Sequence, residues 1–64
     1  MSAFQVRIDG EITWLRLHHI SGSRGYCYLT PGNTREHHFQ KPLEVGQRFT
    51  TSGHFYEVLG EGHE

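Results

Sequence analysis

Histidine is the residue type that offers the most chemistry in this 64-residue chain, which contains six of them. Four histidines form two adjacent pairs, His18-His19 and His37-His38. Neighbouring side chains of a strand point to opposite faces, so each pair can direct only one imidazole towards a shared site. Imidazole nitrogens are ligands that zinc accepts, and they also change their charge at about pH 6.5.

A zinc site is one hypothesis for these histidines, and it needs the single cysteine, Cys27. If Pro31-Gly32-Asn33 is a three-residue hairpin loop, Cys27 lies directly opposite His37. The sequence contains neither a Cys-x-x-Cys nor a His-x-x-x-His spacing, which disfavours the site. Histidines on exposed strand faces are the simpler explanation. We therefore predict no cofactor and keep zinc binding as the least favoured alternative, with these ligands: His18 (or His19), Cys27 and His37.

Catalysis by Cys27 would need an activated thiolate and an oriented base, for which His37 is the candidate in that register. A cysteine flanked by Tyr26 and Tyr28 in a strand is more typical of a small core residue, because free cysteine is among the most buried residue types. A β domain of 64 residues also offers little cleft for a substrate. We therefore predict that the protein is not an enzyme.

Basic and aromatic side chains gather in the middle of the sequence. Residues 14–41 contain four Lys or Arg and one Glu, a formal charge of +3, whereas residues 42–64 contain one Arg and four Glu, a formal charge of −3. Arginine and aromatic side chains dominate protein interfaces. Aromatic rings beside a basic groove also bind single-stranded nucleic acid. The candidate partner-binding residues are Trp14, Arg16, Arg24, Tyr26, Tyr28 and Arg35.

A protein partner suits these residues better than nucleic acid, because the whole chain carries a formal charge of −1. A core this small gains stability from association, with another protein or with a second copy. Trp14 and Leu15 point to opposite faces of one strand, which indicates that both faces are covered there. We therefore predict a small non-enzymatic binding module that mediates protein–protein interaction or self-assembly. The alternative is a small β-barrel that binds single-stranded nucleic acid.

Three turn signals position these residues at nearly even spacing: Asp9-Gly10, Pro31-Gly32-Asn33 and Ser52-Gly53. Residues 4–8 alternate apolar and polar side chains, and Asp-Gly after such a segment is typical of a hairpin. With a two-residue loop, Val6 pairs with Thr13. With a bulge at Gly10, Val6 pairs with Ile12, which groups the apolar side chains better and is the register that we favour.

The segment after the second turn has two interpretations. Residues 34–41 return either as a strand, which we favour, or as a short helix with Asn33 at its N-cap and Glu36 three positions on. The strand is favoured because Phe39 is the only clearly apolar side chain that such a helix would bury.

A third hairpin, around Ser52-Gly53, pairs Phe49 with Tyr56 and Arg48 with Glu57 if its loop has two residues.

Together these hairpins predict an all-β fold: a small antiparallel barrel or a strongly twisted sheet of five to six short strands, SH3-like in type. A single domain covers residues 1–60, and residues 61–64 form a frayed polar tail. One cysteine allows no intramolecular disulfide, and no signal peptide or apolar membrane span is evident. These features predict a cytoplasmic protein with no membrane contact.

Overall fold

The structure is a computed structural model that describes residues 3–62. Within that range the chain forms six strands and one short 3-10 turn, η1 (Pro31–Asn33). The strands are β1 (Ala3–Ile8), β2 (Glu11–Ser21), β3 (Gly25–Leu29), β4 (Glu36–Phe39), β5 (Arg48–Thr51) and β6 (His54–Gly62). In this part of the chain no helix has the length and apolar character needed to cross a membrane.

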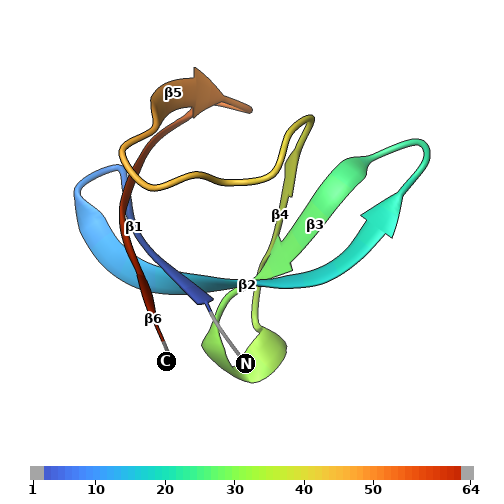
Figure 1. Cartoon of the computed structure of the whole chain (residues 1–64), viewed down its shortest axis with the longest axis horizontal. Helices are drawn as coiled ribbons and strands as arrows, with labels where there is room; N and C mark the ends of the chain where they lie inside the picture. The colour runs from blue at the N-terminus through green and yellow to red at the C-terminus, as the bar shows by residue number, and fades with distance from the viewer. Residues whose placement is uncertain (1–2, 63–64) are drawn as a thin grey trace.

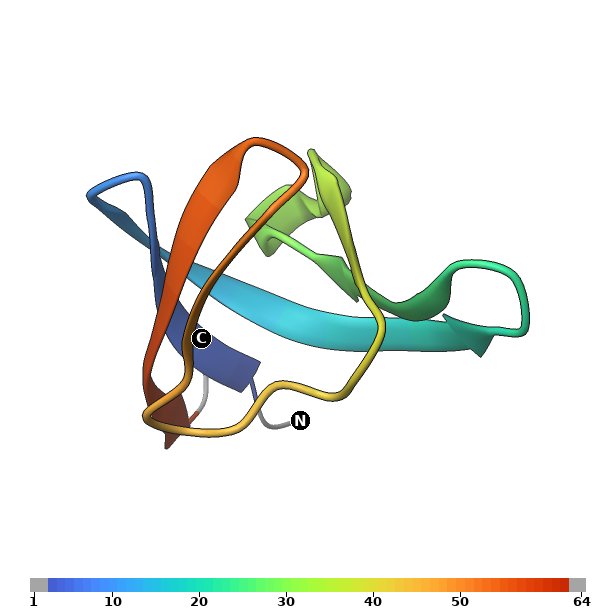
Figure 2. The same cartoon turned by 90° about the horizontal axis from the view of Figure 1, so that it is seen from above.

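The six strands form one antiparallel sheet in the order β4-β3-β2-β1-β6-β5. The sheet curls into a half-barrel whose two edge strands, β4 and β5, do not pair with each other (Figure 1). The all-β prediction is therefore confirmed. The connection 40–47 crosses from one edge to the other, over the concave side of the sheet (Figures 1 and 2).

The first hairpin has the two-residue loop, so the bulged register favoured from the sequence is wrong. Asp9 and Gly10 both have positive φ, 51° and 90°, as a type I′ turn requires. Val6 consequently pairs with Thr13, and Phe4 with Leu15. The turn geometry, matched to the strand twist, decides the register over the apolar pairing that the bulge would have given.

Both faces of β2 are covered at its middle, as predicted. Leu15 is fully buried in the core. Trp14 is half-buried on the other face, where its ring packs over Gly62 at a distance of 3.7 Å from the position that a Cβ would occupy. The Trp14 ring therefore covers the convex face of the sheet where β1 and β6 pair.

The second hairpin brings its return segment back as the strand β4, so the helical interpretation of residues 34–41 is wrong. Its register also differs from the predicted one: Cys27 pairs with His38, and Tyr28 with His37. The turn is longer than three residues, because Thr30 closes it by bonding Arg35. The Thr30 N–H donates to the Arg35 carbonyl at 3.1 Å, and the Arg35 N–H donates to the Thr30 hydroxyl at 3.0 Å.

The third hairpin has the predicted register, with Phe49 opposite Tyr56 and Arg48 opposite Glu57. The two rings stack at 5.3 Å, and the Arg48 and Glu57 side chains form an ion pair at 3.5 Å.

The strand β6 continues further than the sequence predicts. Gly62 pairs with Ala3 and Glu61 with Phe4, so these two residues of the expected tail belong to the sheet. His63 and Glu64, the rest of that tail, lie outside the described residues.

The core lies on the concave side of the curled sheet. It is a cluster of buried side chains from five strands and the connection 40–47: Val6, Leu15, Tyr28, Phe39, Leu43, Tyr56 and Val58. Leu43, in that connection, is only 4% exposed, and its N–H donates to the Tyr28 hydroxyl at 3.0 Å. The connection thus closes the core across one end of the open side.

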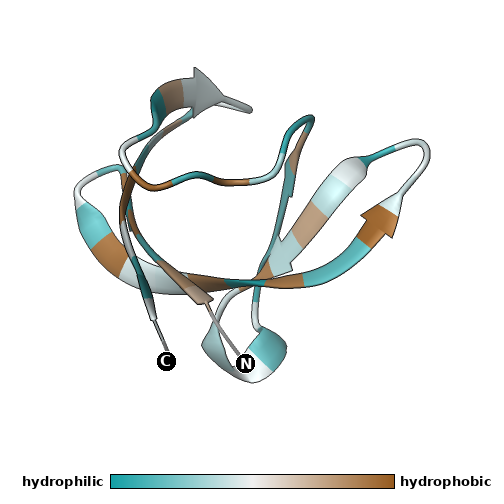
Figure 3. Ribbon diagram, viewed as in Figure 1, coloured by the Kyte–Doolittle hydropathy of each residue, from teal (hydrophilic) through white to brown (hydrophobic). Residues whose placement is uncertain are grey.

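The hairpin of β2 and β3 projects from the body of the half-barrel (Figure 2). Its two strands stay paired almost to the turn, where Ile20 pairs with Tyr26 and Ser21 with Gly25. Ile20 is 63% exposed. Figure 3 shows one hydrophobic segment near the end of β2, after a hydrophilic stretch.

Candidate binding site on the open side of the half-barrel

Two unpaired strand edges border the open side of the half-barrel. The edge strand β4 pairs only with β3, and β5 pairs only with β6. The two edges meet through side chains and not through backbone hydrogen bonds: the Phe39 and Phe49 rings contact each other at 5.5 Å, edge to face. These rings close the core between the edge strands β4 and β5. The main-chain groups that point outwards from each of these two strands stay unpaired within residues 3–62.

Two hollows lie along the β4 edge. The first, of about 350 Å³, is bordered by Phe39, Gln40 and Lys41 on one side and by β5 on the other. The second, of about 210 Å³, lies at the other end of β4 and is lined by residues 35–38 together with Ser52, His54 and Tyr56. Every residue of β4 thus borders one of the two hollows.

Basic side chains predominate around β4. Arg35 precedes the strand and Lys41 follows it at two residues' distance. Glu36 is the one acidic residue that lines either hollow, and its carboxylate lies 3.4 Å from the His38 ring. The formal charge from these side chains is therefore positive even with both histidines of the strand neutral.

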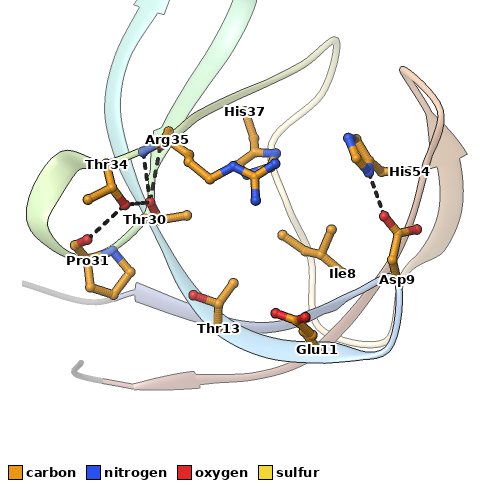
Figure 4. A pocket seen from close by; sticks show the side chains of 10 residues that line it. All are labelled: Ile8, Asp9, Glu11, Thr13, Thr30, Pro31, Thr34, Arg35, His37 and His54. Atoms are coloured by element: carbon orange, nitrogen blue, oxygen red, sulfur yellow. Dashed lines mark hydrogen bonds and ion pairs between the residues drawn. The ribbon is translucent and has the colours of Figure 1, made fainter.

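A third cavity, of about 440 Å³, opens at the mouth of the half-barrel (Figure 4). The turn between β1 and β2 forms one wall, and the connection from β3 to β4 forms the other. The side chains that line it are mostly polar: Ile8, Asp9, Glu11, Thr13, Thr30, Pro31, Thr34, Arg35, His37 and His54.

Asp9 is fixed at the rim of this mouth cavity by contacts with β6. Its Oδ1 accepts the Phe55 N–H at 2.9 Å, and its Oδ2 lies 2.5 Å from His54 Nδ1. The Phe55 N–H, and after it the His54 ring, hold the pKa of the Asp9 carboxyl below its usual value. Asp9 is therefore an ionised, already partnered group at neutral pH.

His37 is the most buried of the polar residues that line the cavity, with 7% of its surface exposed. Its Nδ1 lies 2.9 Å from the Tyr56 hydroxyl, which is itself buried. Burial is the main cause that lowers the pKa of His37 below 6.5, and the nearby Arg35 charge adds to it. Burial also raises the pKa of Tyr56, so its hydroxyl keeps its proton.

The hydrogen bond between a neutral His37 and a protonated Tyr56 has a preferred direction. The phenol is the stronger donor, so its hydroxyl donates to Nδ1, and the ring proton then resides on Nε2. This Nε2 has no hydrogen-bond partner among residues 3–62. A buried ring thus places an unused N–H at the wall of the cavity.

Two opposite charges line the same cavity without joining each other. The Arg35 guanidinium and the Glu11 carboxylate make no hydrogen bond or ion pair with any residue between 3 and 62. Figure 4 shows them on opposite walls, with Arg35 beside the His37 ring.

The structure does not bring the six predicted partner-binding residues together. Tyr28 is 1% exposed and belongs to the core, so it offers almost no surface for a contact. Tyr26 is half-buried and packs against that core. Arg24 lies in the turn of the projecting β2–β3 hairpin.

The remaining three predicted contacts also lie apart. Trp14 and Arg16 are on the convex face, where Arg16 donates to the Asn33 side chain at 3.0 Å. Arg35 alone lies on the open side, where it lines both the mouth cavity and one hollow along β4.

The predicted zinc ligands are likewise separated. Cys27 is fully buried and pairs with His19 and His38, whereas His37 lies on the opposite face with its Nδ1 bonded to Tyr56. His18 falls at the bulge between Leu17 and His19 in β2. Within residues 3–62, no three His, Cys, Asp or Glu side chains form a group that could hold a metal ion.

Several residues of the open side were missed from the sequence: Asp9, Glu11, His54 and Tyr56. Asp9 was assigned only to a turn, and Tyr56 only to an aromatic pair. The pairing of β1 with β6 brings the first turn beside the last hairpin, and residues that are 45 positions apart then meet. No local pattern in the sequence signals that contact.

Comparison with protein-family models, with curated proteins and with solved structures gives no match for this chain.

Proposed function

We propose that the protein is a small non-enzymatic binding module that takes up an acidic, extended segment of a partner protein along the free edge of β4. The single observation that carries this proposal is the open half-barrel, in which β4 pairs on one side only. An extended segment adds to such an edge through main-chain hydrogen bonds, and its alternate side chains enter the neighbouring pockets.

The geometry of β4 supports this mode of binding. The strand pairs with β3 over its whole length, from Glu36 opposite Leu29 to Phe39 opposite Tyr26. In an antiparallel strand, alternate residues direct their N–H and C=O groups to opposite sides, so half of those groups point away from β3. The hollows of about 350 and 210 Å³ lie where side chains of an added segment would fit.

The charges around β4 favour an acidic partner over a second copy. Arg35 and Lys41 flank the strand, and only Glu36 opposes them. Two copies that paired antiparallel through β4 would bring Arg35 of one close to Lys41 of the other, and like charges opposite each other destabilise a sheet. An acidic segment would instead place its carboxylates against these cations.

Peptide selection followed by affinity measurement tests the proposal. Random ten-residue peptides displayed against the immobilised protein should enrich sequences with Asp or Glu, free of proline at the paired positions. Lys41→Gln should weaken binding of a selected peptide about two- to fivefold, the range of an exposed ion pair.

The matched control is Arg24→Gln, which removes the same charge from the projecting hairpin and should leave the affinity unchanged. Equal losses in both variants would indicate a general charge effect and contradict a site on β4. Enrichment of no peptide, together with salt-dependent binding of a mixed single-stranded oligonucleotide, would replace this proposal by the nucleic-acid alternative.

An SH3-like arrangement and a cytoplasmic location stay predictions.

A further inference from the structure

We propose that the mouth cavity binds a free α-amino acid, with the ligand's carboxylate on Arg35 and His37 and its ammonium on Glu11. This inference concerns the mouth cavity, which shares Arg35 with one hollow along β4, and it does not rest on the peptide-binding function.

The first argument is the pair of unsatisfied opposite charges. Arg35 and Glu11 line one cavity from opposite walls, yet neither forms an ion pair within the described range (Figure 4). Guanidinium binds a carboxylate through two parallel N–H···O bonds, and a carboxylate side chain accepts bonds from ammonium. A ligand that carries both charges therefore satisfies both walls at once.

The second argument is the buried ring of His37. Its Nδ1 is bonded to Tyr56, and its Nε2 is without a partner among residues 3–62. His37 as a residue is 93% buried and lines the cavity together with Arg35, which makes it a rigid part of the wall. A donating Nε2–H on a residue that lines the same cavity as a guanidinium can provide a second contact for one carboxylate.

The third argument is the charge balance of the cavity. Its lining contains Arg35 against Asp9 and Glu11, a formal charge of −1, and His54 lies against Asp9. A doubly charged anion such as phosphate would be repelled by the two carboxylates. A zwitterion, which carries one charge of each sign and no net charge, fits this lining better.

The size of the cavity is also suitable. Its volume of about 440 Å³ lies in the range of small-ligand sites. Ile8 and Pro31 add apolar surface to the lining, against which an aliphatic part of the ligand can pack.

Amide NMR titration of the intact 15N-labelled protein tests this inference. Each of the twenty common L-amino acids is added singly, with acetate and methylammonium as probes that carry one charge each. We expect at least one amino acid to give saturable shifts at Glu11, Arg35 and His37. The two single-charge probes should bind at least about tenfold more weakly, because each leaves one wall unsatisfied.

Substitution of each of the two charged side chains in the mouth cavity tests where the ligand binds. Arg35→Gln and Glu11→Gln should each weaken amino-acid binding at least about tenfold, whereas Arg24→Gln should leave it unchanged. The absence of a saturable response to all twenty amino acids would overturn the inference. Equal binding of acetate, or wild-type affinity in either cavity variant, would overturn it as well. The peptide affinity of Lys41→Gln is measured separately, so each proposal can fail alone.

Discussion

Substitution of Gly25 by alanine tests the packing of the second hairpin most sharply. Gly25 begins β3 with a φ of +80°, which L residues rarely adopt. A Cβ at this position would lie 2.3 Å from the carbonyl oxygen of Phe39, at the end of β4. Because that oxygen belongs to the backbone, the end of the β4 edge would have to move.

The expected cost of Gly25→Ala is about 3 kcal/mol. The left-handed conformation accounts for about 1–2 kcal/mol of it, and the displaced backbone of β4 adds a comparable amount. A domain of this size has a total stability of roughly 3–10 kcal/mol. The variant should therefore lose a large fraction of its stability.

Urea unfolding, followed by the fluorescence of the single tryptophan, measures this loss. With a slope of about 1 kcal/mol per molar urea, the midpoint should fall by about 3 M. Gly22→Ala is the matched control: Gly22 has no positive φ, and nothing lies within 4 Å of its added Cβ. The control should stay within about 0.5 kcal/mol of the parent. Equal stability of the two variants would refute this account of the hairpin.

Three further predictions concern the mouth of the half-barrel. Tyr56→Phe leaves His37 Nδ1 without its partner and should lower the free energy of unfolding by about 1–2 kcal/mol. The control Tyr26→Phe loses no hydrogen bond within the described residues and should lower it far less. Urea unfolding of the two variants measures the difference. NMR titration of the His37 ring should give a pKa below 6.5 in the folded protein. The stability that the neutral ring contributes is therefore present above pH 6.5 and is lost as the pH falls through that folded-state pKa. A pKa at or above 6.5 would contradict the burial argument. The pKa of Asp9 is lowered, so the stability that its carboxylate contributes is present above pH 3.8 and is lost on acidification. Asp9→Asn should therefore make the stability fall less steeply with decreasing pH at the acid end. An unchanged acid dependence would show that the contacts with Phe55 contribute nothing.

Local sequence signals predicted the strands and most of the turns. Asp9-Gly10 and Ser52-Gly53 each join two strands, and each turn has positive φ at both positions. The register of the third hairpin followed because Phe49 and Tyr56 pair well on one face while Arg48 and Glu57 pair on the other.

The second hairpin shows where local signals fail. A loop counted as Pro31-Gly32-Asn33 places Cys27 opposite His37, whereas closure by Thr30 and Arg35 shifts the pairing by one residue. In a strand, such a shift moves each side chain to the opposite face relative to its partner. The zinc hypothesis depended on that register.

The open side could not be derived from the sequence, because it arises from contacts between the two ends of the chain. The mouth cavity needs β1 to pair with β6, which places Asp9 beside His54. The free edge of β4 needs the sheet to curl without closing. Tyr28, an apparent contact residue by type, fills the core instead.

Amide hydrogen exchange along β4 tests the central claim most directly. In the free protein, the amides of residues 36–39 that point away from β3 have no partner in the described structure and should exchange rapidly. With a selected acidic peptide bound, those amides should become strongly protected, while the turn of the β2–β3 hairpin stays unchanged. Tight peptide binding that leaves the exchange of residues 36–39 unaltered would contradict binding at this edge.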